Sequence, residues 1–257
     1  MRILAIDAGN TRLKWGLSDG TTWLSRDVLP RLRDIDAQAK FATLLATSLA
    51  PVLAPKKIVV SNVAGDVVGR AIEGVLAKRY PGVQPHWVVS QLAQGGVLNA
   101  YDVAHQLGCD RWASLIAAHH MHDGDCLVVH AGTAVTIDAL SSDGRFLGGL
   151  ILPSFRLMRE TLAANTAQLT LDRGAFTDFP CNTVDAVTTG CEAAILGAIE
   201  RQARIFAPKK NFVCLIGGGG AEELASRLNM KTRLVDNLVL EGLVYISKES
   251  AGRRTGV

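Results

Sequence analysis

Met1-Arg-Ile-Leu-Ala-Ile-Asp7-Ala-Gly9-Asn10-Thr11-Arg12-Leu13-Lys14 opens the chain, and this stretch decides how the fold is interpreted. An apolar run ends in an acid and a glycine, and a second, alternating run begins at Leu13. This pattern predicts two strands joined by a tight turn. It differs from the strand, loop and helix of a P-loop, in which a helix follows the glycines.

The turn carries groups that a phosphate chain requires. Gly9 lets the backbone approach a ligand closely, the hydroxyl of Thr11 can donate a hydrogen bond, and Lys14 adds positive charge. Asp7 can hold a magnesium ion directly or through water, because this metal takes few carboxylates and keeps several waters. The alternative is an ordinary hairpin in which Asn10 and Thr11 only shape the turn. Taken alone, the segment favours the plain hairpin.

Length and composition limit the classes of protein to consider. The chain has 257 residues, of which 48% are hydrophobic and 20% charged, with a formal net charge of +3. These values are typical of a globular protein with one large domain or two small ones. No basic stretch is interleaved with aromatic residues, so nucleic acid is not an expected partner.

The location of the protein is inferred from its N-terminus and its cysteines. The chain starts directly with a strand and lacks the layout of a signal peptide. No uncharged apolar run is long enough to span a membrane. The five cysteines are odd in number and widely spaced. These features predict a reduced, cytoplasmic protein without a membrane partner.

Three histidines, His119, His120 and His122, lie close together at the end of a predicted helix. Adjacent side chains on a helix point apart, and no third ligand is apparent near the two that could share a face. We therefore expect structural or surface roles for them rather than a metal site.

The chain repeats one order of elements. In the first half the pattern predicts strands at 3–8, 13–17, 23–28, 58–61 and 86–89 and helices at 36–49 and 66–79, followed by a segment of little periodicity at 94–108 and a helix from 111. In the second half it predicts strands at 126–131, 135–140, 146–152, 212–216 and 232–235 and helices at 155–168, 184–206, 221–228 and 238–248. A glycine-containing turn follows the first strand of each half.

This repetition predicts an α/β fold made by internal duplication. We expect an N-terminal lobe at 1–115, a C-terminal lobe at 116–250 and a disordered tail at 251–257. Two such lobes would face each other across a cleft and contribute one phosphate-binding turn each. The alternative is two unrelated α/β units with glycines in matching places by chance.

Five motifs in order carry a resemblance to a known family. They are Asp7-Ala-Gly-Asn-Thr11, Gly108-Cys-Asp-Arg111, Gly132-Thr-Ala-Val-Thr-Ile-Asp138, Gly148-Gly149 and Gly217–Gly220. Together they resemble the type III pantothenate kinases, within the superfamily of sugar kinases, Hsp70 and actin. The resemblance runs from Ile3 to about Tyr245. It implies duplicated ribonuclease H-like (actin-like ATPase) lobes with a cleft between them.

The resemblance implies transfer of the γ-phosphate of ATP, with Mg²⁺, to the primary hydroxyl of pantothenate, the first step towards coenzyme A. It places the ATP phosphates on Asp7, Ala8, Gly9, Asn10, Thr11, Arg12, Leu13, Lys14 and Thr133, with Asp7 as the metal ligand. It places adenosine against Gly217 to Gly220. A kinase of another small molecule on the same fold, or a regulatory accessory factor without catalysis, remains the alternative. The presence of Asp7, Asp110, Arg111 and Thr133 favours the enzyme.

The resemblance also implies a substrate site, made of Tyr101, Gly108, Cys109, Asp110, Arg111 and Thr183. Asp110 would accept the proton of the hydroxyl, and Arg111 would bind the pantothenate carboxylate through its planar fork. The alternatives are a helix cap for Asp110, a core aromatic for Tyr101 and a helix N-cap for Thr183. A homodimer is implied as well. The apolar face of the helix at 184–206 is a candidate for the contact, although core packing explains it equally well.

The sequence departs from the family pattern at a few positions. His130 stands where an aspartate is common that helps to bind potassium or ammonium, and imidazole is a poor ligand for such a hard cation. We therefore expect the dependence on K⁺ or NH₄⁺ to be altered or lost, or backbone carbonyls to carry the cation site alone. Ala104 and Thr170 stand where prolines are common, and Ser154 stands where a glycine is usual.

Overall fold

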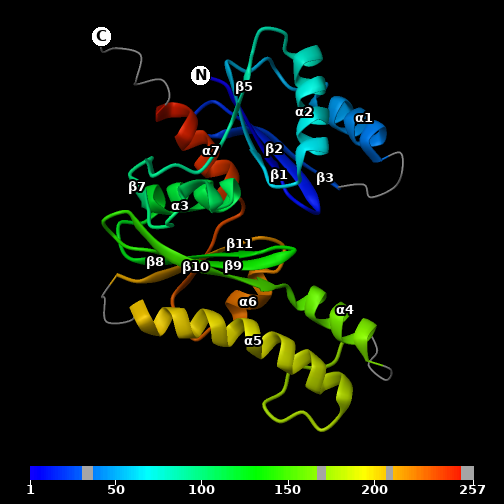
Figure 1. The fold of residues 1–257 in the computed structure, drawn as a ribbon, viewed down its shortest axis with the longest axis vertical. Coiled ribbons are helices and arrows are strands. Elements are labelled where there is room, and N and C mark those ends of the chain that lie inside the picture. The colour runs from blue at the N-terminus through cyan, green and yellow to red at the C-terminus, as the bar shows by residue number, and fades with distance from the viewer. Residues whose placement is uncertain (31–36, 167–171, 207–210, 250–257) are drawn as a thin grey trace. The chain divides into compact units, whose positions relative to one another are not determined.

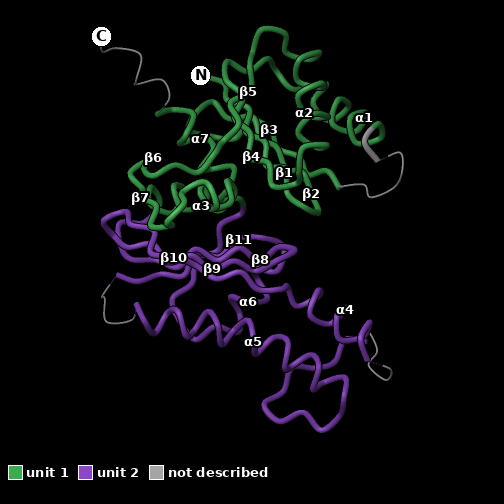
Figure 2. Tube along the Cα trace, viewed as in Figure 1, with its two compact units in different colours: residues 1–121, 237–257 green, residues 122–236 purple. Residues whose placement is uncertain are grey.

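The computed structural model describes residues 1–30, 37–166, 172–206 and 211–249. The chain divides into two compact units, which are coloured separately in Figure 2. Unit 1 comprises residues 1–121 and 237–257, and unit 2 comprises residues 122–236.

Unit 1 is built on a mixed sheet with the strand order β3-β2-β1-β4-β5. The antiparallel pairs are β1–β2 and β2–β3, and the parallel pairs are β1–β4 and β4–β5. The elements of this unit are β1 (Ile3–Ala8), β2 (Arg12–Ser18), β3 (Trp23–Pro30), α1 (Ala37–Leu49), β4 (Lys57–Asn62), α2 (Asp66–Arg79), β5 (Pro85–Trp87), β6 (Ala93–Gln94), β7 (Val97–Asn99), the 3₁₀ turn η1 (Ala104–Gln106), α3 (Cys109–Met121) and α7 (Leu238–Glu249).

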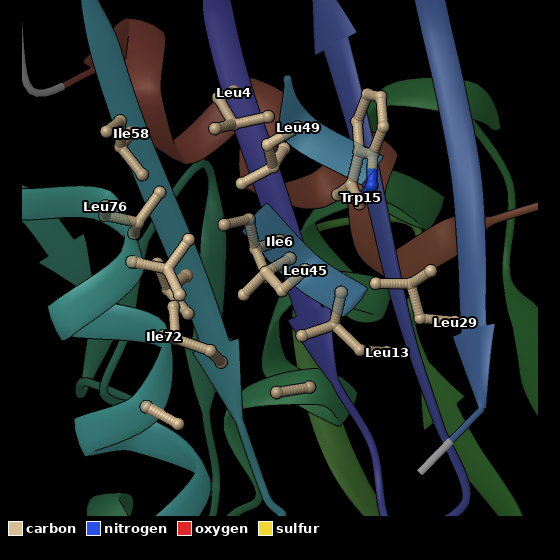
Figure 3. Close-up of a cluster of buried hydrophobic side chains, with 14 of the residues drawn as sticks. Leu4, Ile6, Leu13, Trp15, Leu29, Leu45, Leu49, Ile58, Ile72 and Leu76 are labelled. Carbon is tan, nitrogen blue, oxygen red and sulfur yellow. The ribbon is translucent and has the colours of Figure 1, made fainter. Parts of the chain in front are cut away.

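One face of this sheet packs against α1 and α2. Because side chains alternate along a strand, every second residue of β1, β2 and β4 points to this face. Figure 3 shows Leu4 and Ile6 of β1 meeting Leu45 of α1 and Ile72 of α2 in a continuous apolar cluster. All four side chains are fully buried. This cluster fixes which face each strand residue occupies.

The opposite face of the sheet carries α3 and α7, which pack against each other. In β1 and β4, the residues that lie between the core residues point to this opposite face. They include Asp7 and Ser61, which are direct neighbours in the register of the parallel pair β1–β4. The burial pattern of the two strands therefore brings a carboxylate and a hydroxyl under the helix that contains Asp110.

Unit 2 repeats this topology (Figure 1). Its strands lie in the order β12-β11-β8-β9-β10, with β8–β9 and β9–β10 antiparallel and β8–β11 and β11–β12 parallel. The elements are β8 (Cys126–Ala131), β9 (Ala134–Leu140), β10 (Arg145–Pro153), α4 (Phe155–Asn165), α5 (Thr183–Phe206), β11 (Val213–Gly217), α6 (Ala221–Arg227) and β12 (Thr232–Leu234). Since strands of the same rank occupy the same place and direction in both sheets, the expected duplication is confirmed.

The core of unit 2 also lies on one face of its sheet. Leu127 and Val129 of β8 pack with Ile195 and Ile199 of α5 and with Leu224 of α6. The alternating residues of β8, among them His130, point to the other face. His130 pairs with Thr136 across the β8–β9 hairpin, as Asp7 pairs with Lys14 across the β1–β2 hairpin. The duplication therefore makes His130 the counterpart of Asp7.

The units differ from the lobes expected from sequence. The division lies after residue 121 rather than after residue 115, because α3 is one continuous helix and belongs entirely to unit 1. The C-terminal helix α7 also belongs to unit 1, where it packs against α3, β1 and β4. Gly242 of α7 allows this close packing, since a Cβ there would lie 1.8 Å from the carbonyl oxygen of Ala113. The expected tail at 251–257 and Thr170 lie outside the described residues.

Most predicted elements are present with shifted ends. The segment at 94–108, expected to lack regular structure, contains β7 and η1 and part of β6. The helix expected at 155–168 is described as Phe155–Asn165, and Ser154 is its N-cap, with the hydroxyl oxygen accepting a hydrogen bond from the Leu157 N–H at 3.2 Å. None of the described helices is both long enough and apolar enough to cross a lipid bilayer.

Candidate active site

The turn between β1 and β2 is held by one backbone hydrogen bond. The N–H of Gly9 donates to the carbonyl of Arg12 at 3.0 Å, and a Cβ at Gly9 would lie only 3.2 Å from the same oxygen. Asn10 and Thr11 are exposed at the tip. The predicted strand–turn–strand is therefore confirmed, and its tip consists of exposed polar residues.

Asp7 is the buried group of this turn. It is 7% exposed and lies opposite Lys14 in the antiparallel register. The pKa of Asp7 is raised to about 7, mainly by burial and also by the negative charge of Asp110, while Lys14 opposes the shift. Ionising a buried carboxylate beside another carboxylate costs free energy, and a bound cation would reduce that cost.

The N-terminus of α3 lies beside Asp7. Cys109, the first residue of the helix, has its sulfur 3.3 Å from the hydroxyl oxygen of Ser61, which is fully buried on β4. Ser61 is in turn the register neighbour of Asp7. This contact links the start of α3 to the strand next to Asp7. Sequence reasoning missed Ser61, although the alternation of its strand already placed it on the same face as Asp7.

Asp110 is the second residue of α3, in the first turn of the helix. One of its carboxylate oxygens accepts a hydrogen bond from the N–H of Arg111 at 2.8 Å. A carboxylate in the first helical turn is stabilised by the free N–H groups and by the helix dipole. The expected alternative of an N-cap is wrong, because the helix begins before Asp110. Gly108 gives the carboxylate room, since a Cβ there would lie 2.6 Å from it.

Arg111 and Tyr101 form a pair. A guanidinium N–H of Arg111 donates to the hydroxyl oxygen of Tyr101 at 3.1 Å, and the guanidinium carbon lies 5.8 Å from the centre of the ring. Arg111 is 6% exposed, which is unusual for an arginine, whereas Tyr101 is half-buried. Tyr101 is therefore not a core aromatic, and its hydroxyl lies at the arginine predicted to bind substrate.

Residues 91–108, which contain Tyr101, are called here the substrate loop. Its end is held by the hydroxyl of Ser90, which donates to the carbonyl of Leu107 at 2.7 Å. The indole N–H of Trp112 donates to the side chain of Gln94 at 3.0 Å. The side chain of Asn99 makes three further bonds inside the loop. Neither Ser90 nor Asn99 was predicted from sequence, since nothing in a linear pattern identifies the carbonyls they contact.

In unit 2 the corresponding turn contains Gly132 and Thr133. The N–H of Gly132 donates to the carbonyl of Ala134 at 3.1 Å, so this turn is one residue shorter than that of unit 1. The His130 ring lies against the turn, because a Cβ at Gly132 would be 2.9 Å from its Nε2. Thr133 is half-buried in the turn itself.

The glycine run after β11 packs beside this turn. Gly218 has a φ of 101°, and a Cβ there would lie 2.5 Å from the carbonyl oxygen of Ala131. The N–H of Gly220 donates to the same oxygen at 3.2 Å, immediately before α6. Only glycine allows this conformation and this approach, and the result places two backbone turns of unit 2 next to each other.

Thr183 is the first residue of α5 and is exposed. The residue before it caps the helix: the Asn182 side chain accepts from the N–H of Asp185 at 2.9 Å and donates to its carboxylate at 2.6 Å. The suggestion that Thr183 is the N-cap is therefore wrong. Its hydroxyl is not needed for the cap.

The three histidines near the end of α3 have identifiable contacts. His119 lies against the turn at Gly96, where a Cβ would be 2.7 Å from its Nε2. The ring of His120 stacks on Tyr245 of α7 with 4.2 Å between centroids, and a ring nitrogen of His122 lies 2.8 Å from the carbonyl oxygen of Asn211. Over the parts of the chain that the structure describes, no group of three or more histidine, cysteine, aspartate or glutamate side chains is arranged to hold a metal.

Comparison with known proteins identifies the family. The family model of type III pantothenate kinase matches residues 3–205. The type III pantothenate kinase of Azoarcus sp. (strain BH72) is 43% identical over 251 residues, which cover 97% of this chain and 92% of that protein.

Solved structures of low sequence identity share the fold. EutJ, an ethanolamine utilization protein of Carboxydothermus hydrogenoformans, gives a TM-score of 0.55 at 11% identity and covers 96% of this chain and 89% of its own. MreB5 of Spiroplasma citri gives 0.54 at 10% identity and covers 99% of both chains. These likenesses concern the actin-like fold alone. By the family model and its full-length relative, the chain belongs to the type III pantothenate kinases, enzymes that phosphorylate pantothenate with ATP.

Proposed function

We propose that unit 1 contains the phosphoryl-transfer chemistry of this enzyme, with Asp110 as the proton acceptor. The observation that carries the proposal is the position of Asp110 in the first turn of α3, where its charge acts on Asp7 at the phosphate turn. A base and a phosphate-binding turn close together are what in-line transfer to a hydroxyl requires. A carboxylate suffices, since a loose transition state asks little of the base until late.

Arg111 is proposed to bind the carboxylate of pantothenate, and Tyr101 to orient it. Its contact with the Tyr101 hydroxyl fixes the guanidinium in one plane. A planar fork in a fixed orientation can offer two parallel N–H donors to a carboxylate, and burial strengthens that interaction. As the next residue along the chain, Arg111 would hold the anionic end of the substrate near the proton acceptor. Gly108 and Cys109 would contribute backbone at the same place.

The turn from Asp7 to Lys14 is proposed to hold the phosphates of ATP. Its exposed tip offers N–H groups and the hydroxyl of Thr11, and Lys14 adds a positive charge opposite Asp7. Asp7 fits a magnesium ion, because its raised pKa reflects a buried charge that lacks sufficient compensation, and Mg²⁺ takes one or two carboxylates with phosphate oxygens and waters. When bound, the ion would neutralise part of the charge of the phosphates.

Unit 2 is proposed to carry ligand-binding residues of its own. Thr133 with its turn would contribute to phosphate binding, the run from Gly217 to Gly220 would accept adenosine, and Thr183 would contact pantothenate. His130 replaces an oxygen ligand at the proposed site for potassium or ammonium. A homodimer is proposed as the assembled form.

The test uses two substrates that differ only at the carboxylate. Purified protein is expected to convert pantothenate and ATP to 4′-phosphopantothenate, and to use pantothenol, in which a hydroxymethyl group replaces the carboxylate, with a kcat/KM about a hundredfold lower. Arg111→Lys should lower kcat/KM for pantothenate much more than for pantothenol. Absence of turnover with pantothenate would contradict the function, and an equal loss on both substrates would contradict the role of Arg111.

A further inference from the structure

We infer that Asn99 is a positioning residue that sets the substrate loop, and through it Tyr101, for binding of the substrate carboxylate. This inference rests on the proposed role of Tyr101 and Arg111. Asn99 is the last residue of β7, immediately before the segment that carries Tyr101. Its side chain is half-buried and points into the loop that it belongs to.

The amide of Asn99 joins three points of the backbone. Its nitrogen donates to the carbonyl of Gln91 at 3.3 Å and to the carbonyl of Ala104 at 3.1 Å. Its oxygen accepts from the N–H of Tyr101 at 3.0 Å. The Asn99 side chain therefore connects the start of the loop, the backbone of Tyr101 and the start of η1.

The effect of these bonds reaches the substrate site through one further contact. The Tyr101 N–H is held by Asn99, and the Tyr101 hydroxyl accepts from Arg111. With the backbone of Tyr101 fixed, its hydroxyl can meet the guanidinium in only a narrow range of positions. Asn99 thus acts on Arg111 through Tyr101.

Asparagine is suited to this position because its amide combines two donors with an acceptor in one short, planar group. Aspartate would keep the acceptor for Tyr101 and would place a charge against the carbonyls of Gln91 and Ala104. Alanine would lose all three bonds and leave those groups to solvent. Only alanine would therefore release the Tyr101 N–H, whereas aspartate would release the carbonyls of Gln91 and Ala104 alone.

Other contacts anchor the loop independently of Asn99. Ser90 holds the carbonyl of Leu107, Gln94 accepts from Trp112, and the N–H of Gly95 donates to the carboxylate of Glu249 at 3.0 Å. Because the last two of these bonds fix the loop to α3 and α7, loss of the Asn99 amide should loosen Tyr101 without unfolding the unit.

The experiment compares Asn99→Ala with a rescue variant and a matched control. Ala104→Pro is the rescue, since position 104 is the first residue of η1 and Val103 before it is extended, with a φ of −121° and a ψ of 99°. Proline suits the first position of a helix and requires an extended residue before it. Asn165→Ala is the control, because Asn165 also donates its amide to a backbone carbonyl, that of Thr161, at 2.8 Å.

Asn99→Ala should raise KM for pantothenate about tenfold, with kcat and KM for ATP within about twofold of the wild type. Ala104→Pro should recover about two- to fivefold of that rise in the Asn99→Ala background and change the wild type little. Asn165→Ala should leave all three constants unchanged. Should Asn99→Ala fail to fold by circular dichroism, Asn99→Leu, which keeps the size of the side chain and also lacks all three hydrogen bonds, should raise KM for pantothenate in the same way.

Two results would overturn the inference. One is a fall in kcat with unchanged KM values, and the other is a rise in KM for pantothenate that Ala104→Pro does not reduce. Tyr101→Phe distinguishes a failure of the positioning role of Asn99 from a failure of the proposed substrate site. If Tyr101→Phe raises KM for pantothenate and Asn99→Ala does not, only the positioning role fails. If neither variant raises it, the proposed substrate site fails.

Discussion

Asp7 at the end of β1 and Asp110 at the start of α3 lie close enough that the charge of one acts on the other. Burial is the larger reason why the pKa of Asp7 rises to about 7, and the charge of Asp110 adds to it. The unliganded protein would therefore be more stable with only one of these two carboxylates. Such a cost is expected where a cation and a phosphate chain are to be bound.

Asp7→Asn should stabilise the metal-free protein at pH 8 and abolish activity. The raised pKa means that the native state holds this proton up to about pH 7, whereas the unfolded chain releases it near the ordinary value of 3.8. The free energy of unfolding contributed by Asp7 therefore falls as the pH rises from about 4 to 7, by up to about 4 kcal/mol. We expect a gain of about 2 kcal/mol at pH 8, since the buried amide also needs partners.

This gain should disappear as the pH falls towards 4, where Asp7 is protonated in both states. Denaturant unfolding with a chelator present measures it, and Asp102→Asn, which changes an exposed carboxylate of the substrate loop, is the control. A gain that grows as the pH falls would contradict the assignment of the raised pKa to Asp7.

Ser61 and Cys109 should show a coupling free energy. The contact of 3.3 Å between hydroxyl and thiol joins β4 to the start of α3. Ser61→Ala and Cys109→Ala should each lower the free energy of unfolding by about 1 kcal/mol, and the double variant should lose less than the sum, by about 0.5 kcal/mol or more. A matched cycle pairs Ser61→Ala with Cys126→Ala, a buried thiol of unit 2, and should be additive. Additivity in both cycles would show that the contact contributes nothing.

His130→Asp should increase the dependence of activity on potassium or ammonium. His130 is the unit 2 counterpart of Asp7 by register and offers imidazole where a hard cation prefers oxygen. The wild type is expected to show similar rates in sodium, potassium and ammonium salts, and the variant to be faster in the last two. Strict potassium dependence of the wild type would contradict this expectation.

Cys181 should report on the proposed contact of Thr183 with substrate. It is the exposed member of the five free cysteines, whereas burial raises the pKa of Cys126 and Cys214 to about 12 and also raises the pKa of Cys109. Iodoacetamide at pH 8 should therefore alkylate Cys181 first, as peptide mass spectrometry can follow. Saturating pantothenate should slow this reaction. An unchanged rate would place Thr183 away from the substrate.

Local pattern predicted the strands and turns of the site well. The hairpin register of Asp7 and Lys14 and the face of each strand follow from alternation and from one glycine, which are properties of neighbouring residues. The contacts that complete the site join distant segments. The Ser61–Cys109 contact and the coupling of Asp7 to Asp110 depend on how α3 packs on the sheet, which no local pattern contains.

At two further places the structure differs from the prediction because contacts and hydrogen bonds, rather than a local pattern, decide the outcome. The apolar face of α7 would fit either unit in the sequence, and only its packing against α3 and β1 assigns it to unit 1. Asn182 and Thr183 are both good caps, and the helix start differs by one residue between the two possibilities. Such a choice is decided by the local hydrogen bonds, not by residue type.

The steady-state kinetics of Asp110→Asn test the central proposal most directly. The amide keeps the shape of the side chain but cannot accept the proton of the hydroxyl. We expect kcat to fall about a hundredfold or more, with KM for pantothenate and for ATP within about twofold of the wild type and Asp102→Asn unaffected. Undiminished kcat in Asp110→Asn would contradict the assignment of Asp110 as the proton acceptor.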